Sequence, residues 1–242
     1  MAMIVDNPAA RLLAILKAGK TKDVRLPSRQ VWYELLQVEP GNHALLAERL
    51  AKLMALPAII ATEMQEHHAD ENQTVSYWRG RVDSAFVNIN INAPWAEFIN
   101  QIDDHSLNYL SVTAKLLQHA TKLKPFGQAH LGELRGTLNE LLKEVIEAEI
   151  DAEVKLSITR YLGRLINSID EYFITGVLPI LDAANATFGN VVVDPKYKEF
   201  LTNEPLGKKL VSAVSTVANA VTVVTGLPQL GQMLGLLISN AM

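Results

Sequence analysis

Apolar side chains recur at helical spacing through most of the chain. The most regular segment has an apolar side (Leu138, Leu141, Leu142, Val145, Ile146) and a charged side (Glu140, Lys143, Glu144, Glu147). Thr137 stands at the spacing of a capping box with Glu140, which predicts a helix start there. Asp151 is placed to cap a second helix that continues to Phe173. The two segments predict an antiparallel pair of helices.

Capping residues and helix breakers predict further helices upstream. The predicted starts are Asn7 with Pro8, Asn42, Pro57, and Asp103 or Asp104. Residues 75–92 keep helical spacing but also alternate as a strand would toward their end, and we predict a helix there. Ala93-Pro94-Trp95 predicts a structured turn in which Trp95 is buried.

The chain is therefore predicted to be all-α, a multi-helix bundle with a short apolar C-terminal helical hairpin. We divide it into an N-terminal helical region (1–92), a central antiparallel helix bundle packed on it (93–188), a linker or hinge (189–207) and a C-terminal tail (208–242). The hinge is predicted because Asp194-Pro195 and Glu204-Pro205 interrupt the helical pattern just before the tail.

Residues 210–242 contain no Asp, Glu, Lys, Arg or His. On a helix over residues 210–225, the polar side chains Ser212, Ser215, Thr216, Asn219, Thr222 and Thr225 gather on one side, and valines and alanines fill the other. A helix face that meets water usually carries Lys and Glu. An uncharged polar face therefore indicates contact with protein or with a membrane interface.

The second half of the tail predicts another short helix. Gly226 and Pro228 break the pattern, and the leucines that follow return to helical spacing, with Gly231 and Gly235 forming a small-xxx-small pair that admits a close neighbour. At about 1.5 Å per residue the two helices would reach roughly 24 Å and 16 Å, against a hydrocarbon core of about 30 Å. A single transmembrane anchor is disfavoured, which leaves burial in the protein or its homo-oligomer, membrane contact, or docking of another protein.

Composition narrows the class of protein. With 49% hydrophobic and 20% charged residues the chain is globular, and a net charge of −4 lacks the basic field of a nucleic-acid-binding protein. A helix-turn-helix outline near residues 28–54 offers few base-reading groups, so we do not expect nucleic acid as a partner. Cysteine is absent, and the N-terminus makes a poor signal peptide. We expect a cytoplasmic body, with membrane association as an alternative.

Candidate chemistry is sparse. The sequence has no P-loop, dinucleotide-binding fingerprint, G-x-S-x-G or H-E-x-x-H motif, so it predicts no catalytic residue and no cofactor, although a site built from scattered residues stays open. Glu63 and His67, one helical turn apart, are the best metal candidates, but no second ligand pair follows and we predict no metal site. One basic cluster (Lys17, Lys20, Lys22, Arg25, Arg29) could meet anionic lipid or phosphate; a solvated loop is the simpler interpretation.

The functional hypothesis therefore depends on the tail. We predict a non-enzymatic helical interaction or assembly protein whose uncharged apolar C-terminal tail mediates oligomerisation or docks a partner, which is the chain itself or another protein. The contact residues would be Val214, Val217, Asn219, Val221, Val224, Gly231, Leu234, Gly235 and Leu237. The alternative is a membrane-active effector, of the toxin or phage-defence type, that releases its C-terminal hairpin into or onto a bilayer.

Overall fold

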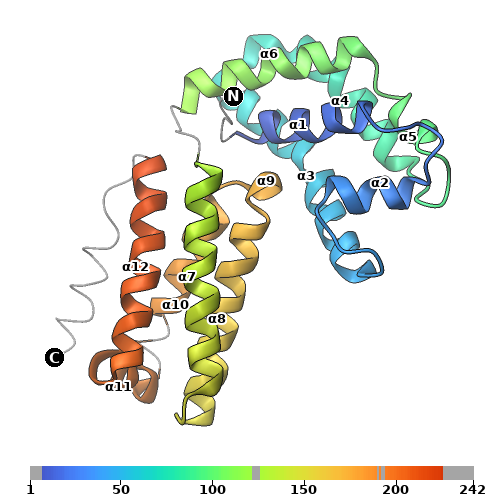
Figure 1. The fold of residues 1–242 in the computed structure, drawn as a ribbon. Coiled ribbons are helices and arrows are strands. Elements are labelled where there is room, and N and C mark those ends of the chain that lie inside the picture. The colour runs from blue at the N-terminus through green and yellow to red at the C-terminus, as the bar shows by residue number, and fades with distance from the viewer. Residues whose placement is uncertain (1–6, 122–125, 190, 192–193, 226–242) are drawn as a thin grey trace. The chain divides into compact units, whose positions relative to one another are not determined.

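The computed structural model describes residues 7–121, 126–189, 191 and 194–225, and over these residues it contains helices and no β-strand (Figure 1). The predicted all-α fold class is confirmed. The chain forms two compact units, Met1–Leu123 (unit 1) and Lys124–Met242 (unit 2). The division by sequence placed its first boundary after residue 92, whereas α6 (Asp104–Thr121) packs on α1 (Pro8–Lys20) and α4 (Asn72–Val87) within unit 1.

The other helices of unit 1 are α2 (Ser28–Leu35), α3 (His43–His67), the short 3-10 helix η1 (Ala69–Glu71) and α5 (Ala96–Ile99). Three predicted caps are confirmed by hydrogen bonds. The Asn7 side chain accepts from the Ala10 N–H at 2.8 Å, the Asn42 side chain from the Leu45 N–H at 3.2 Å, and the Asp103 carboxylate from the Ser106 N–H at 2.7 Å. Each cap satisfies a backbone donor that the first turn of its helix leaves unpaired.

The predicted helix start at Pro57 is wrong, because Pro57 lies inside α3. A proline in a helix interior removes one backbone hydrogen bond and costs about 3 kcal/mol. Around it Leu53, Leu56, Ile60 and Met64 form one continuous buried stripe. Burial of that stripe offsets the penalty and carries the helix through the proline.

The turn around Trp95 fills the aromatic core of unit 1, as predicted. Trp95 is fully buried, its indole N–H donates to the Gly19 carbonyl at 2.9 Å, and its ring packs edge-on against Trp32 with centroids 5.0 Å apart. A Cβ at Gly19 would lie 2.9 Å from the Trp95 ring, so glycine allows this close approach. The segment that could have been a strand forms α4, which ends at Val87.

Unit 2 contains α7 (Gln128–Glu147), α8 (Ala152–Asp170), α9 (Tyr172–Thr175), α10 (Leu178–Gly189), α11 (Pro195–Asn203) and α12 (Pro205–Thr225). Four of these helices form a closed ring, because α7 packs on α8, α8 on α10, α10 on α12, and α12 on α7 (Figure 1). The Asp151 cap of α8 is confirmed. The capping box at Thr137 is wrong, since Thr137 lies within α7 and its hydroxyl donates back to the Glu133 carbonyl.

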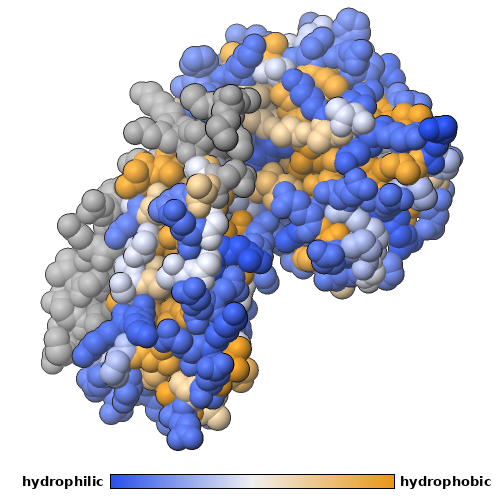
Figure 2. Space-filling view, viewed as in Figure 1, coloured by the Kyte–Doolittle hydropathy of each residue, from blue (hydrophilic) through white to orange (hydrophobic). Residues whose placement is uncertain are grey.

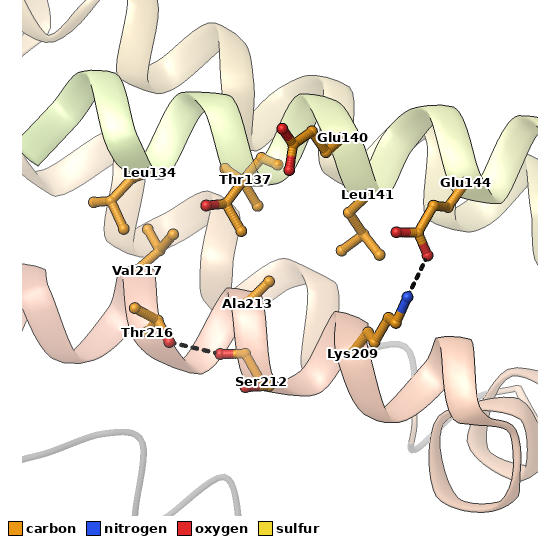
Figure 3. Close-up of a pocket in the computed structure, with 11 residues that line it drawn as sticks. Leu134, Thr137, Glu140, Leu141, Glu144, Lys209, Ser212, Ala213, Thr216 and Val217 are labelled. Atoms are coloured by element: carbon orange, nitrogen blue, oxygen red, sulfur yellow. Dashed lines mark hydrogen bonds and ion pairs between the residues drawn. The ribbon is translucent and has the colours of Figure 1, made fainter.

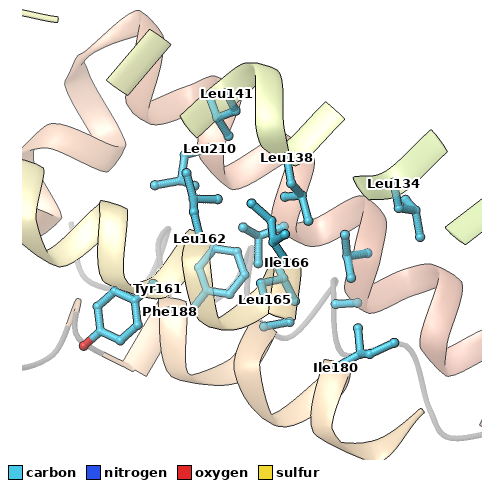
Figure 4. Close-up of a cluster of buried hydrophobic side chains, with 14 of the residues drawn as sticks. Leu134, Leu138, Leu141, Tyr161, Leu162, Leu165, Ile166, Ile180, Phe188 and Leu210 are labelled. Atoms are coloured by element: carbon cyan, nitrogen blue, oxygen red, sulfur yellow. The ribbon is translucent and has the colours of Figure 1, made fainter. Parts of the chain in front are cut away.

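The core of unit 2 lies inside this ring, where leucine, isoleucine and valine side chains from all four helices meet (Figure 4). From α12 it receives Leu210, Val214, Val217, Ala218 and Val221, each almost fully buried. The first half of the predicted tail is therefore the fourth helix of the bundle. Its second half, residues 226–242, lies outside the described residues.

The interval predicted to be a hinge contains α11, which is attached to its neighbours by several contacts. Tyr197 is fully buried and its hydroxyl donates to the Thr187 carbonyl at 3.0 Å; this burial raises the pKa of the phenol. A Cβ at Gly207 would lie 2.0 Å from the Phe200 carbonyl oxygen, so α11 and α12 meet backbone to backbone. A hinge describes the motion of one segment relative to another, and the hinge predicted over residues 189–207 stays a prediction.

Candidate interaction surface

The structure separates the predicted tail residues by face. Val214, Val217 and Val221 point into the core of unit 2, Val224 is partly buried, and Asn219 is exposed. Gly231, Leu234, Gly235 and Leu237 lie outside the described residues. The side of α12 that another molecule could reach is thus the polar side, because the valines already contact their own bundle.

Four side chains form a stripe along the outside of α12. Ser212, Thr216, Asn219 and Val223 are exposed and follow the i, i+4, i+7, i+11 spacing of a single helix face. Val223 is 66% exposed, although valine is usually buried. We call these four residues the α12 stripe; it carries no charge over its whole length.

Hydroxyl groups along α12 find their partners within the helix. Thr216 Oγ1 donates to the Ser212 carbonyl at 2.9 Å, Thr222 Oγ1 to the Asn219 carbonyl at 2.9 Å, and Thr225 Oγ1 to the Val221 carbonyl at 3.1 Å. Of these three residues only Thr216 belongs to the α12 stripe. Because its hydroxyl is satisfied internally, another protein surface could cover it without leaving that donor unpaired.

The outward sides of α7 and α8 are different. On α7 the exposed residues include Glu133, Arg135 and Lys143, and on α8 they include Glu153 and Arg164, although Ile146 on α7 and Leu156 on α8 are exposed as well. Hydrophilic and hydrophobic residues are mixed over the visible face of this unit (Figure 2). Such charges are typical of a surface that stays in water.

A groove runs between α7 and α12, with a volume of about 340 Å³ (Figure 3). Its apolar lining comes from Leu134, Leu138, Leu141, Ala213 and Val217, and hydroxyl groups stand at its edge on Thr137, Ser212 and Thr216. At one end Lys209 Nζ lies 2.7 Å from a carboxylate oxygen of Glu144. We call this feature the α7–α12 groove; Ser212 and Thr216 belong to both the groove and the α12 stripe.

The predicted basic cluster lies in unit 1, where two of its five cations pair with carboxylates. Lys22 lies 2.6 Å from Glu34 and lowers the pKa of that carboxyl group, and Arg25 lies 2.7 Å from Asp23 and lowers its pKa to about 2.

The remaining three cations of the basic cluster are Lys17, Lys20 and Arg29. Arg29 donates to the Asn92 side chain at 2.8 Å, while Lys17 and Lys20 are exposed in the last turn of α1. Contact with an anion at this cluster stays a prediction.

Metal-ligating groups are dispersed. Within the described ranges, His, Asp and Glu side chains nowhere gather in a group of three or more that could hold a metal ion. Near the Glu63 and His67 pair, the His68 ring nitrogen Nε2 lies 3.3 Å from the Leu116 carbonyl oxygen, a structural contact.

Two parts of this surface could not be identified from sequence. Val223 was not assigned to either side of the helix, because helical spacing alone does not show how wide the buried side of a helix is. The α7 lining of the groove was missed because spacing on one helix does not show which neighbour lies beside it. A signal was present for the α12 stripe, namely polar residues at helical spacing without charge.

Comparisons of this chain with protein-family models, with curated proteins and with solved structures found no match. The functional argument therefore depends on the geometry of the chain itself.

Proposed function

We propose that this chain is a non-enzymatic assembly protein whose copies associate through the C-terminal helix of unit 2. The observation that carries the proposal is the α12 stripe, which is free of charge from Ser212 to Val223 after Lys208 and Lys209 near the start of the helix, on a bundle whose other long helices, α7 and α8, expose charges along their length. Exposed apolar area at Val223 and the internally bonded hydroxyl of Thr216 favour burial of this face against protein.

A second copy of the chain is the partner that this chemistry suits. A symmetric dimer brings the same patch together from both subunits, so charges of one sign on that patch would be brought close to one another. The α12 stripe has no charge to repel, and its small side chains at residues 212 and 216 let a second helix approach closely. A different protein partner would instead leave the chain monomeric when it is purified alone.

The test compares molar masses by light scattering over a range of concentrations. We expect the full chain to exceed its monomer mass, and Thr216→Lys to return it toward the monomer, because each subunit would place an ammonium group within the uncharged contact face. The matched control is Asn167→Lys on the exposed side of α8, which should keep the mass of the unmodified chain. A full chain that stays monomeric at every concentration would contradict self-association.

Truncation must respect the fold of unit 2. A chain ending near Gly207 would lose α12 and with it Val214, Val217 and Val221 from the core. Removing residues 226–242 leaves the four-helix ring complete. This shorter deletion separates the contribution of the final segment from that of α12.

Membrane action is the second candidate, favoured by the absence of ionic side chains from residues 210–242. Across the helices that the structure describes, none is both long and apolar enough to span a bilayer. Flotation with vesicles of phosphatidylcholine and phosphatidylglycerol tests it. Membrane action predicts that the full chain floats and that the chain ending at Thr225 does not; equal behaviour of the two would remove this candidate.

A further inference from the structure

We infer that a pocket beside α2 in unit 1 binds a small carboxylic acid whose body is apolar. The inference goes beyond the proposed function and does not depend on it, because the pocket and the α12 stripe lie in different units. We call this feature the α2 pocket. Its volume is about 520 Å³, within the range of roughly 300–1,000 Å³ that is typical of small-molecule sites.

The α2 pocket offers apolar surface to the body of a ligand. Four of its lining residues contribute this surface: Pro27, Tyr33, Val38 and Pro40. Tyr33 and Val38 are buried and the two prolines are exposed, so the apolar lining extends from the surface into the interior of unit 1. An apolar ligand body placed here would remove this lining from water.

The other lining residues are Arg29, Gln30 and Glu34, and together with their partners they leave one positive charge unbalanced. The Glu34 carboxylate lies 2.6 Å from Lys22 Nζ, and this ammonium group lowers the pKa of Glu34. Among the described residues, no carboxylate forms an ion pair with Arg29, which bonds instead to the Asn92 side chain. The carboxylate of a ligand would supply the partner that this guanidinium group lacks.

Arg29 is held in position by its surroundings. Its backbone N–H donates to the Ile91 carbonyl at 2.9 Å, and its Nη2 donates to the Asn92 side-chain oxygen at 2.8 Å. Its Nη1 lies 3.5 Å from His43 Nδ1, and the Tyr33 hydroxyl lies 2.6 Å from the same nitrogen. A guanidinium group held by these contacts loses little further side-chain entropy when a carboxylate binds it.

The charge around the α2 pocket favours a carboxylate over a phosphate. A phosphate monoester carries nearly two negative charges at neutral pH, and protein sites usually match it with several cations. Here Lys22 is paired with Glu34, and Arg25 is paired with Asp23. The guanidinium group of Arg29 alone suits a ligand with a single negative charge, and its planar donors match the geometry of a carboxylate.

Isothermal titration calorimetry of the full chain with 1-naphthoate tests the inference. Two matched probes separate its parts: 1-naphthalenemethanol keeps the apolar body without the charge, and acetate keeps the carboxylate without the body. We expect 1-naphthoate to bind with a Kd of about 1 mM or below, and each matched probe to bind at least about tenfold more weakly. No binding of 1-naphthoate, or equal binding of either matched probe, would overturn the inference.

A first variant tests the role of Arg29. Arg29→Gln should weaken binding of 1-naphthoate at least about tenfold, because it removes the charge that pairs with the carboxylate. The matched control is Arg25→Gln, the same change at an exposed residue of the basic cluster outside the pocket lining, and it should leave binding unchanged. Equal losses in the two variants would show general attraction to the basic cluster and would overturn the α2 pocket as the site.

A second variant keeps Arg29 and its contacts. Gln30→Glu adds a carboxylate to the lining at an exposed position of α2, so it should weaken binding severalfold by repulsion while the helix stays folded. The matched control is Gln73→Glu, at an exposed position of α4 outside the lining, and it should bind as the unmodified chain does. Unchanged binding in Gln30→Glu, with circular dichroism showing a folded chain, would overturn the inference.

Discussion

The inner sides of α8 and α12 are alike, and their outer sides are not. Both helices bury a stripe of aliphatic residues in the same core, with Val154 and Ile158 from α8 and Val214 and Val221 from α12. Outside, α8 exposes Arg160 and Arg164, whereas α12 exposes only uncharged side chains after Lys208 and Lys209 near its start. The demands of packing explain the shared inner sides; they do not explain why one outer side avoids charge.

The ion pairs of α8 and α12 also differ in where they lie along each helix. The exposed ends of α8 take part in ion pairs, with Arg135 contacting Asp170 and Lys196 lying 3.2 Å from Asp151. Along α12 the ion pair between Lys209 and Glu144 lies at the N-terminal end, before the α12 stripe begins. The charged side is built for water, and we interpret the uncharged side as built for contact.

The largest expected effect is on the free energy of unfolding, and it tests whether the buried sides of α8 and α12 contribute equally to stability. Val214→Ala and Val154→Ala each remove two buried methyl groups, so each should lower the free energy of unfolding by about 2 kcal/mol. Urea denaturation followed by circular dichroism measures this loss. All three tryptophans lie in unit 1, so their emission follows the other unit as a control. A loss below about 0.5 kcal/mol for Val214→Ala alone would show that α12 is not an equal member of the bundle.

A smaller effect on the free energy of unfolding, dependent on pH, is expected at Asp151, which caps the start of α8. The backbone N–H of Val154 and then the Lys196 ammonium group hold the pKa of Asp151 below its usual value. A lowered pKa in the folded state stabilises the protein above the unfolded value of about 3.9, and this contribution disappears as the pH falls through the folded pKa.

The measurement is the stability of Asp151→Asn relative to the unmodified chain as a function of pH. The unmodified chain should be the more stable of the two at neutral pH, and the difference should shrink as the pH drops below about 4. A difference that stays constant into acid would contradict the assignment of the effect to the Asp151 charge.

The smallest effect concerns the outer side of α12. Thr216→Ala removes a side chain that bonds only within its own helix and introduces a better helix former, so stability should rise by about 0.5 kcal/mol or less. Association should persist, because no charge is added. Thermal unfolding and light scattering on the same sample check both statements, and loss of association would mean that the Thr216 hydroxyl itself contacts the partner.

Local signals in the sequence predicted local structure well. The caps at Asn7, Asp103 and Asp151 and the burial of Trp95 were read correctly, because each depends on a few neighbouring residues. The helix start predicted at Pro57 was wrong, because burial along the whole of α3 outweighs one lost backbone hydrogen bond.

Long-range arrangement could not be predicted in the same way. The closed ring of α7, α8, α10 and α12 and the groove between its first and last members depend on residues far apart in sequence. The uncharged side of α12 was visible in the sequence, but its division into a buried side and an exposed stripe required the neighbouring helices.

The central claim, that protein covers the α12 stripe, can be tested most directly by thiol accessibility. Thr216→Cys and Asn167→Cys each introduce one cysteine into a chain that has none, at exposed positions on α12 and α8. We predict that the alkylation rate at residue 216 falls as protein concentration rises, while the rate at residue 167 stays constant. Equal and concentration-independent rates at the two positions would contradict the account.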